Sequence, residues 1–303
     1  MKRIFEIELI KLRHGKTTKV IAIIYAAITI LSLIILTYLY KSSVDMYQTY
    51  GGGEAENLSN FPPLSFPFVW LIGSVVSSIL IIFPAILAVL NASNEFSSKI
   101  HRQHIIDGLS KDEYILSKFF SVLIISLSFT IYTAFLCIIM GLVHNTGAIP
   151  QEILDAMSNH VFRDNHPLIW LFGYFLYTLS ILSFGLLISF IFKNTGRSIF
   201  AFVGYYLVLE WIIIAFLVKW KLFLAAKLLP VWSVANNIFP NTITGGFIDA
   251  AEMKSNGTLD QVNQEDMLRE LFAFDFTDSL IAIIYIGIYF LLIKWIFFRR
   301  DLN

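Results

Sequence analysis

One carboxylate and one pair of histidines are the residues of this chain best suited by type and position to do chemistry. Glu210 is the only acidic residue in the apolar stretch "SIFAFVGYYLVLEWIIIAFLV", residues 198–218. A carboxylate in such surroundings is costly and commonly marks a path for ions or substrate. The alternative is a structural hydrogen bond to a Ser or Tyr of another helix, and the sequence favours neither.

His101 and His104 are three residues apart, a spacing that could place two imidazoles on one helix face as metal ligands. No third ligand accompanies them, so we expect no metal site and interpret both as exposed residues at a partner interface. Cys137 is the only cysteine, which excludes a disulfide framework. HExxH, GxSxG and the GxxxxGK[ST] phosphate loop are all absent, so no hydrolytic or ATPase site is expected in this chain.

The composition indicates an all-α integral membrane protein. Of the 303 residues, 57% are hydrophobic and 15% are charged. Apolar runs of eighteen or more residues are long enough to cross the hydrocarbon layer as helices. We predict six spans, with the following approximate limits: Val20–Tyr40, Phe68–Leu90, Phe119–Val143, Leu168–Phe192, Ser198–Val218 and Ser279–Phe298.

Basic residues predict the orientation of these spans. Fourteen Lys and Arg fall in the leader, the 91–118 loop, "KNTGR" and the C-terminal "RRDLN", against seven in the opposite loops. Because Lys and Arg accumulate on the cytoplasmic side, both termini are expected there. We treat residues 1–303 as a single membrane domain.

The leader and the largest outer loop remain ambiguous. Residues 1–19 suit an amphipathic helix on the inner surface, with Phe5, Leu9 and Leu12 on its apolar face, although "FEIEL" also alternates like a strand. Residues 219–278 contain apolar stretches broken by prolines and lysines, which favours short helices in the outer leaflet over a seventh span.

The polar segment 91–118 separates the second and third spans. No proline interrupts the chain after the second span, so a helix can continue there until Gly108, a residue suited to ending a helix. Ser110 and Glu113 have the spacing of a capping box, which predicts a new helix from near Lys111. The segment therefore predicts a short helix held between two spans.

The layout resembles the membrane subunit of an ABC-2-type transporter. The similarity rests on "NEFSSKIHRQHIIDGLSKDEYILSKF" between spans 2 and 3, the basic leader, the six spans and the enlarged loop before the last span. An acidic residue, a short helix, a turn with Ser, and a Lys opening span 3 recur in that family. Glu95, Gly108, Ser110 and Lys118 occupy those places here.

The resemblance implies that the short helix is a coupling helix that docks on a separate cytoplasmic ATPase. The implied coupling residues are Glu95, Lys99, Ile100, Arg102, His104, Ile105, Asp107 and Gly108. It also implies a second permease subunit, identical or different, and ATP and Mg²⁺ bound to the partner rather than to this chain. Export across a bacterial inner membrane is a further implication. Membrane lipids are an expected partner and nucleic acid is not.

Two other function classes are open. An ion-coupled secondary transporter would use Glu210 as its ion site, and a polytopic membrane enzyme would need a catalytic constellation that the sequence lacks. Pro84, in "IIFPAIL", removes a backbone donor from span 2 and is a candidate hinge, with a passive packing kink as the alternative.

Overall fold

The computed structural model describes residues 2–50, 64, 66, 68–106, 108–144, 167–229 and 276–300, and every regular element within these ranges is helical. The all-α prediction is thus confirmed for the described chain. The helices are α1 (Lys2–His14), α2 (Lys16–Tyr50), α4 (Phe68–Ile79), α5 (Ile82–Ser97), α6 (Ile100–Ile106), α7 (Lys111–His144), α9 (Pro167–Phe192), α10 (Thr195–Gly204), the π-helical turn η1 (Tyr205–Leu209), α11 (Glu210–Lys219), α12 (Phe223–Lys227) and α16 (Phe276–Arg300).

Five continuous helical segments are long and apolar enough to cross a membrane, and α4 with α5 forms a sixth only if the pair is counted as one span. The second predicted span is bent, because α4 and α5 meet at an angle of 46°. The bend lies one turn before Pro84. Since Pro84 has no N–H, the carbonyl of Leu80 accepts instead from the amide of Phe83, three residues on, at 3.2 Å.

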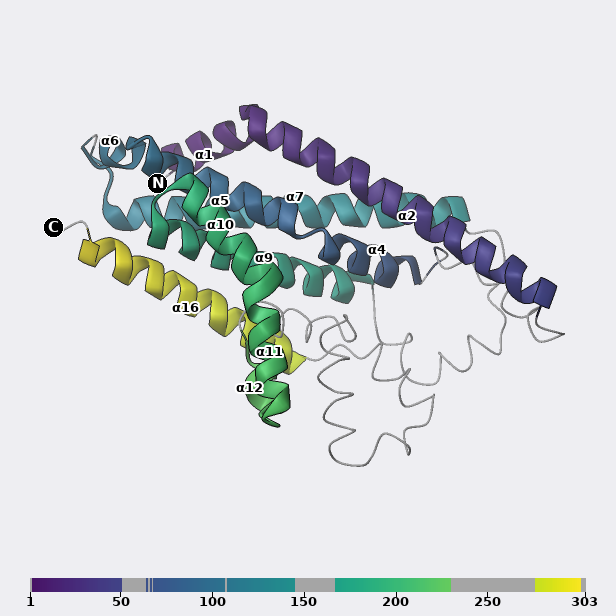
Figure 1. Ribbon diagram of the computed structural model, residues 1–303. Helices are drawn as coiled ribbons and strands as arrows, with labels where there is room; N and C mark the ends of the chain where they lie inside the picture. Colours follow the sequence, from purple (N-terminus) through teal and green to yellow (C-terminus); the bar gives the residue numbers. More distant parts are fainter. Residues whose placement is uncertain are drawn as a thin grey trace.

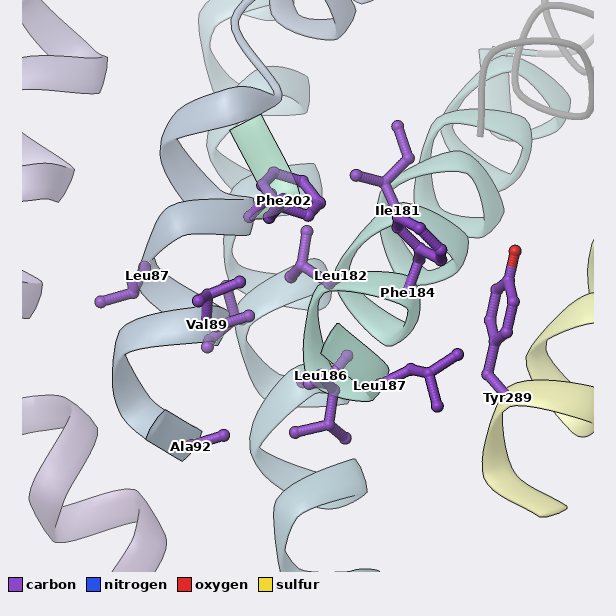
Figure 2. Packing of buried hydrophobic residues seen from close by; sticks show 14 of the residues in the cluster. Leu87, Val89, Ala92, Ile181, Leu182, Phe184, Leu186, Leu187, Phe202 and Tyr289 are labelled. Atoms are coloured by element: carbon purple, nitrogen blue, oxygen red, sulfur yellow. The ribbon is translucent and has the colours of Figure 1, made fainter. Parts of the chain in front are cut away.

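Helix α9 lies at the centre of the bundle and packs against α16, α5 and α7. Figure 2 shows the side chains of α9, among them Leu182, Phe184 and Leu187, meeting those of α5, α10 and α16 in one continuous apolar core. Helix α9 is apolar around its whole circumference. That composition suits a helix surrounded by other helices on all sides.

Helices α1 and α6, the beginning of α7 and the end of α16 lie at one end of the bundle, here called the α6 end (Figure 1). The leader is helical, so the helix interpretation of "FEIEL" is confirmed and the strand interpretation is wrong. Helix α12 is a short helix within the predicted 219–278 loop. The rest of that loop, residues 230–275, lies outside the described residues.

Candidate functional site

Four charged side chains from three helices meet inside the α6 end. Lys11 of α1 contacts Glu95 of α5 at 2.8 Å and Glu8 of its own helix at 3.3 Å. Lys118 of α7 contacts the same two carboxylates, Glu95 at 2.6 Å and Glu8 at 2.9 Å. Each cation therefore lies between two anions and each anion between two cations. We call Glu8, Lys11, Glu95 and Lys118 the charge cluster.

Three side chains of the charge cluster are buried, and the fourth, Lys11, is 34% exposed. Only 1% of the Lys118 side chain is exposed, and both carboxylates are buried. The Tyr114 hydroxyl donates to the second oxygen of Glu95 at 3.0 Å, and the Ser121 hydroxyl donates to the second oxygen of Glu8 at 2.7 Å. Buried charges are tolerated where they are paired and hydrogen-bonded in this way, so the cluster fixes the positions of α1, α5 and α7 relative to one another.

Electrostatic interactions keep Glu8 and Lys11 of α1 ionised inside the charge cluster. Burial alone would raise the pKa of Glu8, but Lys118 and Lys11, together with hydrogen bonds from Lys118 and Ser121, lower it to about 2. Burial would lower the pKa of Lys11, but Glu95 and Glu8 raise it above its usual value. Both side chains are therefore ionised at neutral pH.

The depressed pKa of Glu8 predicts an acid-sensitive contribution to stability. Because the unfolded carboxyl binds its proton near pH 4.5 and the folded one near pH 2, the contribution is complete above pH 4.5 and is lost as the pH falls towards 2. The shift corresponds to about 3 kcal/mol. Unfolding of the detergent-solubilised protein, followed from pH 6 to pH 2, should show a steep loss of stability that is reduced in Glu8→Gln. Parallel curves for the two proteins would contradict this assignment.

Sequence reasoning singled out Glu95 and Lys118 but missed Glu8 and Lys11. Of the residues expected on the apolar face of α1, Leu12 is buried and Leu9 is 47% exposed. The side of α1 turned to the bundle is the one that carries the cluster residues, which are held by ion pairs. The available signal was the placement of Glu8 four residues before Leu12, on the same side of the helix.

Helix α6 carries the residues expected to contact a partner. Lys99 and Arg102 are exposed, and Ile100 is partly so. His104 and Ile105 are half-buried, and Ile105 packs against the core. Asp107 lies outside the described residues. The predicted coupling residues are thus divided between an outward and an inward side of one short helix.

His101 departs from its expected exposed position. Its ring is buried, with its centroid 5.0 Å from that of Phe96, and its Nδ1 lies 3.3 Å from the carbonyl oxygen of Glu95. The three-residue spacing was right for a helix, but α6 folds back on the end of α5 and turns this position inward. Within the described ranges, no group of three or more His, Cys, Asp or Glu side chains is placed to hold a metal.

The turn between α6 and α7 has the geometry expected from its sequence. Gly108 has φ of +98°, in the region open to glycine. The Ser110 hydroxyl accepts from the Glu113 amide at 3.2 Å, and the Glu113 carboxylate accepts from the Ser110 amide at 3.1 Å. The hydrogen bonds that the Ser110 amide and hydroxyl donate to the carboxylate lower the pKa of Glu113. Helix α7 therefore starts at Lys111 with a reciprocal capping box.

A notch of about 200 Å³ opens beside the charge cluster, between α1, α5 and the start of α6. It is lined by Lys11, Asn91, Asn94, Glu95, Ser98 and Ile100. Nearby, the Thr195 hydroxyl at the start of α10 donates to the Asn94 side-chain oxygen at 2.9 Å. The end of α5 thus connects α1, α6, α7 and α10.

Glu210 is fully buried and far from the charge cluster along the chain. It opens α11 directly after η1, where the helix widens to π geometry. Tyrosines of α9, η1 and α16 are close enough to interact with it electrostatically: Tyr177, Tyr205, Tyr206, Tyr285 and Tyr289. A π-helical turn inside a helix is frequent at functional sites. The π-helical turn lies directly beside the buried carboxylate of Glu210. This arrangement is compatible with both roles predicted for Glu210, a transport path and a structural hydrogen bond.

A comparison with protein families finds one match that covers most of the chain. The family model described as "ABC-2 family transporter protein" matches residues 48–299, which include Glu95 and Lys118 but neither Glu8 nor Lys11. A search of curated proteins gives no match.

Proposed function

The chain belongs to the ABC-2 transporter family, and from this premise we propose that it is the membrane subunit of an ATP-driven exporter whose ATP is hydrolysed on a separate subunit. In this proposal the α6 end faces the cytoplasm, and α6 docks on an ATPase dimer that carries the ATP and Mg²⁺. A second permease subunit, identical or different, completes the transport path. The setting is a bacterial inner membrane, with lipid around the bundle.

One observation carries the proposal: α6 lies at the end of the bundle with one side exposed, and short turns join it directly to two bundle helices, α5 and α7. It is tied to α5 by the Phe96–His101 contact, and the turn that leads to α7 is held to α6 by the hydrogen bond from the Leu109 amide to the His104 carbonyl at 3.0 Å. The charge cluster holds the ends of α5 and α7 together through Glu95 and Lys118. A displacement of α6 by a partner would therefore move α5 and α7, not just a loop.

The bend before Pro84 could act as a hinge in this mechanism. The half of the span next to α6 could tilt about the break at Leu80 and Ile81 while α4 keeps its packing against α7. We propose Pro84 as the hinge. Transport that is unaffected in Pro84→Ala would leave a static packing bend as its explanation.

The proposed function predicts a stoichiometric complex that depends on α6. We expect the full chain, purified from its own host, to be recovered with an ABC ATPase at a fixed stoichiometry. Replacing Ile100–Ile106 with a Gly/Ser segment should abolish recovery, because the docking helix is gone. The same replacement of α12 (Phe223–Lys227), which lies far from α6 in Figure 1, is the matched control and should leave recovery intact.

Transport measured in vesicles decides the class of transporter. An ATP-driven permease requires the ATPase for any transport, whereas a chain that transports with an ion gradient alone would overturn the proposal. The full burial of Glu210 is the observation that favours the ion-coupled alternative. In that case Glu210→Gln should abolish transport driven by the gradient.

A further inference from the structure

The outward side of α6 has a defined chemical character. Arg102, Gln103 and Ile106 lie at helical spacing on α6, and Lys99 lies in the turn immediately before it. All four are exposed, and Ile106 is 81% exposed. The opposite side carries His101 and Ile105, which are turned inward. We call Lys99, Arg102, Gln103 and Ile106 the α6 face.

The α6 face is presented in a fixed conformation. Lys99 has φ of +59°, an unfavourable value for a residue with a side chain, and this makes the sharp turn between α5 and α6. Its amide donates to the Phe96 carbonyl at 3.2 Å, and at the other end the Leu109 amide donates to the His104 carbonyl at 3.0 Å. A surface that is already ordered loses little conformational freedom on binding.

Among the described residues, no carboxylate forms an ion pair with Lys99 or Arg102. Glu95 is paired with Lys11 and Lys118, whereas Glu113 accepts hydrogen bonds from the neutral Ser110 and keeps its charge. Asp112 pairs with Lys294 of α16 at 2.8 Å. The α6 face therefore has a cationic part, Lys99 and Arg102, towards the start of α6 and an exposed isoleucine, Ile106, at its end.

We propose that the α6 face docks in an acidic groove of the ATPase, with Ile106 filling an apolar pocket and acidic side chains around it meeting Lys99 and Arg102. This inference rests on the proposed function and adds the chemistry of the partner surface. Buried apolar anchors supply most of the affinity at such interfaces, and surrounding charges supply association rate and specificity.

An anionic membrane surface fits the α6 face less well. Helices that lie on a membrane bury a continuous apolar stripe over many turns. Helix α6 has only two turns, and Ile106, at its end, is the one strongly exposed apolar side chain of the α6 face. A compact protein pocket can enclose one such side chain, and a lipid surface gains little from it.

The first test measures affinity for the ATPase recovered with the wild-type chain. We expect Lys99→Glu/Arg102→Glu to raise the Kd at least tenfold and to remove most of the dependence of the Kd on salt concentration. Ile106→Asp should raise the Kd by a similar or larger factor at all salt concentrations. Lys19→Glu, an exposed cation on α2, is the control and should bind as the wild type does. All four proteins should unfold at the same temperature, because the altered side chains are exposed.

Failure of this inference can be distinguished from failure of the proposed function. If the charge-reversed protein binds as tightly as the wild type while the Gly/Ser replacement of α6 abolishes binding, α6 docks but the acidic groove is wrong. If no ATPase is recovered with the wild type, both the proposed function and this inference are wrong.

A second test separates a protein partner from a lipid partner. Ile106→Cys, labelled with a polarity-sensitive fluorophore, is placed in nanodiscs of phosphatidylcholine with or without phosphatidylglycerol. The only natural cysteine, Cys137, is buried and should not be labelled. We expect a blue shift when the ATPase is added and none when phosphatidylglycerol is included. A blue shift caused by phosphatidylglycerol alone would overturn the docking proposal in favour of a membrane contact.

Discussion

Lys118→Met is expected to lower the free energy of unfolding by about 3–5 kcal/mol, the usual cost of removing one partner from a buried ion pair. The Lys118 ammonium lies 2.6 Å from Glu95 and 2.9 Å from Glu8. Without it, two buried carboxylates share Lys11 alone. Methionine preserves most of the side-chain volume, so the loss should report on charge and not on a cavity. Chemical unfolding in detergent, with the transition followed by circular dichroism, would measure the loss.

Two further variants test whether burial and charge balance cause this loss. Lys294→Met removes an ion pair of similar length, 2.8 Å to Asp112, but both of those side chains are largely exposed. It should therefore cost less than about 1 kcal/mol. Adding Glu8→Gln to Lys118→Met leaves Lys11 and Glu95 as a balanced pair and should restore part of the lost stability. Equal losses for the two lysine variants would show that the charge cluster does not stabilise the fold as described.

Local sequence signals predicted much of the fold. Apolar run length located the long helices, and α9 and α16 begin and end within three residues of the predicted spans. The capping box at Ser110 and Glu113 and the turn at Gly108 depend on neighbouring residues only, so their geometry could be inferred before any tertiary contact was known. The same reasoning placed the start of α7 at Lys111.

The remaining features depend on contacts between distant parts of the chain. Lys11 meets Glu95 across 84 residues, and Glu8 meets Lys118 across 110. A helical wheel of α1 ranks positions by hydrophobicity. It cannot show that Glu8 and Lys11, on one side of α1, form ion pairs with residues of other helices. For the same reason His101 was placed outside, although the return of α6 onto Phe96 buries it.

Helix breaks were the other feature that the sequence could not specify. Pro84 marked a weak point in the second span, but it did not specify the angle of 46° between α4 and α5. The π-helical turn before Glu210 has no proline or other breaker within it. Apolar run length alone therefore specified neither the angle of the bend nor the π-helical turn.

The position of α1 leads to a second prediction with a large effect. Glu8→Lys would place a third ammonium group beside Lys11 and Lys118, with only Glu95 to balance them. Since buried like charges repel strongly, we expect α1 to separate from the bundle and the protein to lose more stability than in Lys118→Met. Hydrogen exchange should then accelerate at least tenfold in α1 and α6, with little change in α16.

Glu6→Lys is the matched control for this variant. It makes the same change of charge on the same helix two residues away, at an exposed position, and should alter stability by no more than about 0.5 kcal/mol. If α1 were held only by the lipid surface, both variants would behave alike, because an added lysine favours an anionic membrane at either position. If the charge cluster holds α1, Glu8→Lys alone should reduce transport while the ATPase subunit keeps its own activity. Equal effects of the two variants on transport and exchange would show that the charge cluster does not connect α1 to α6.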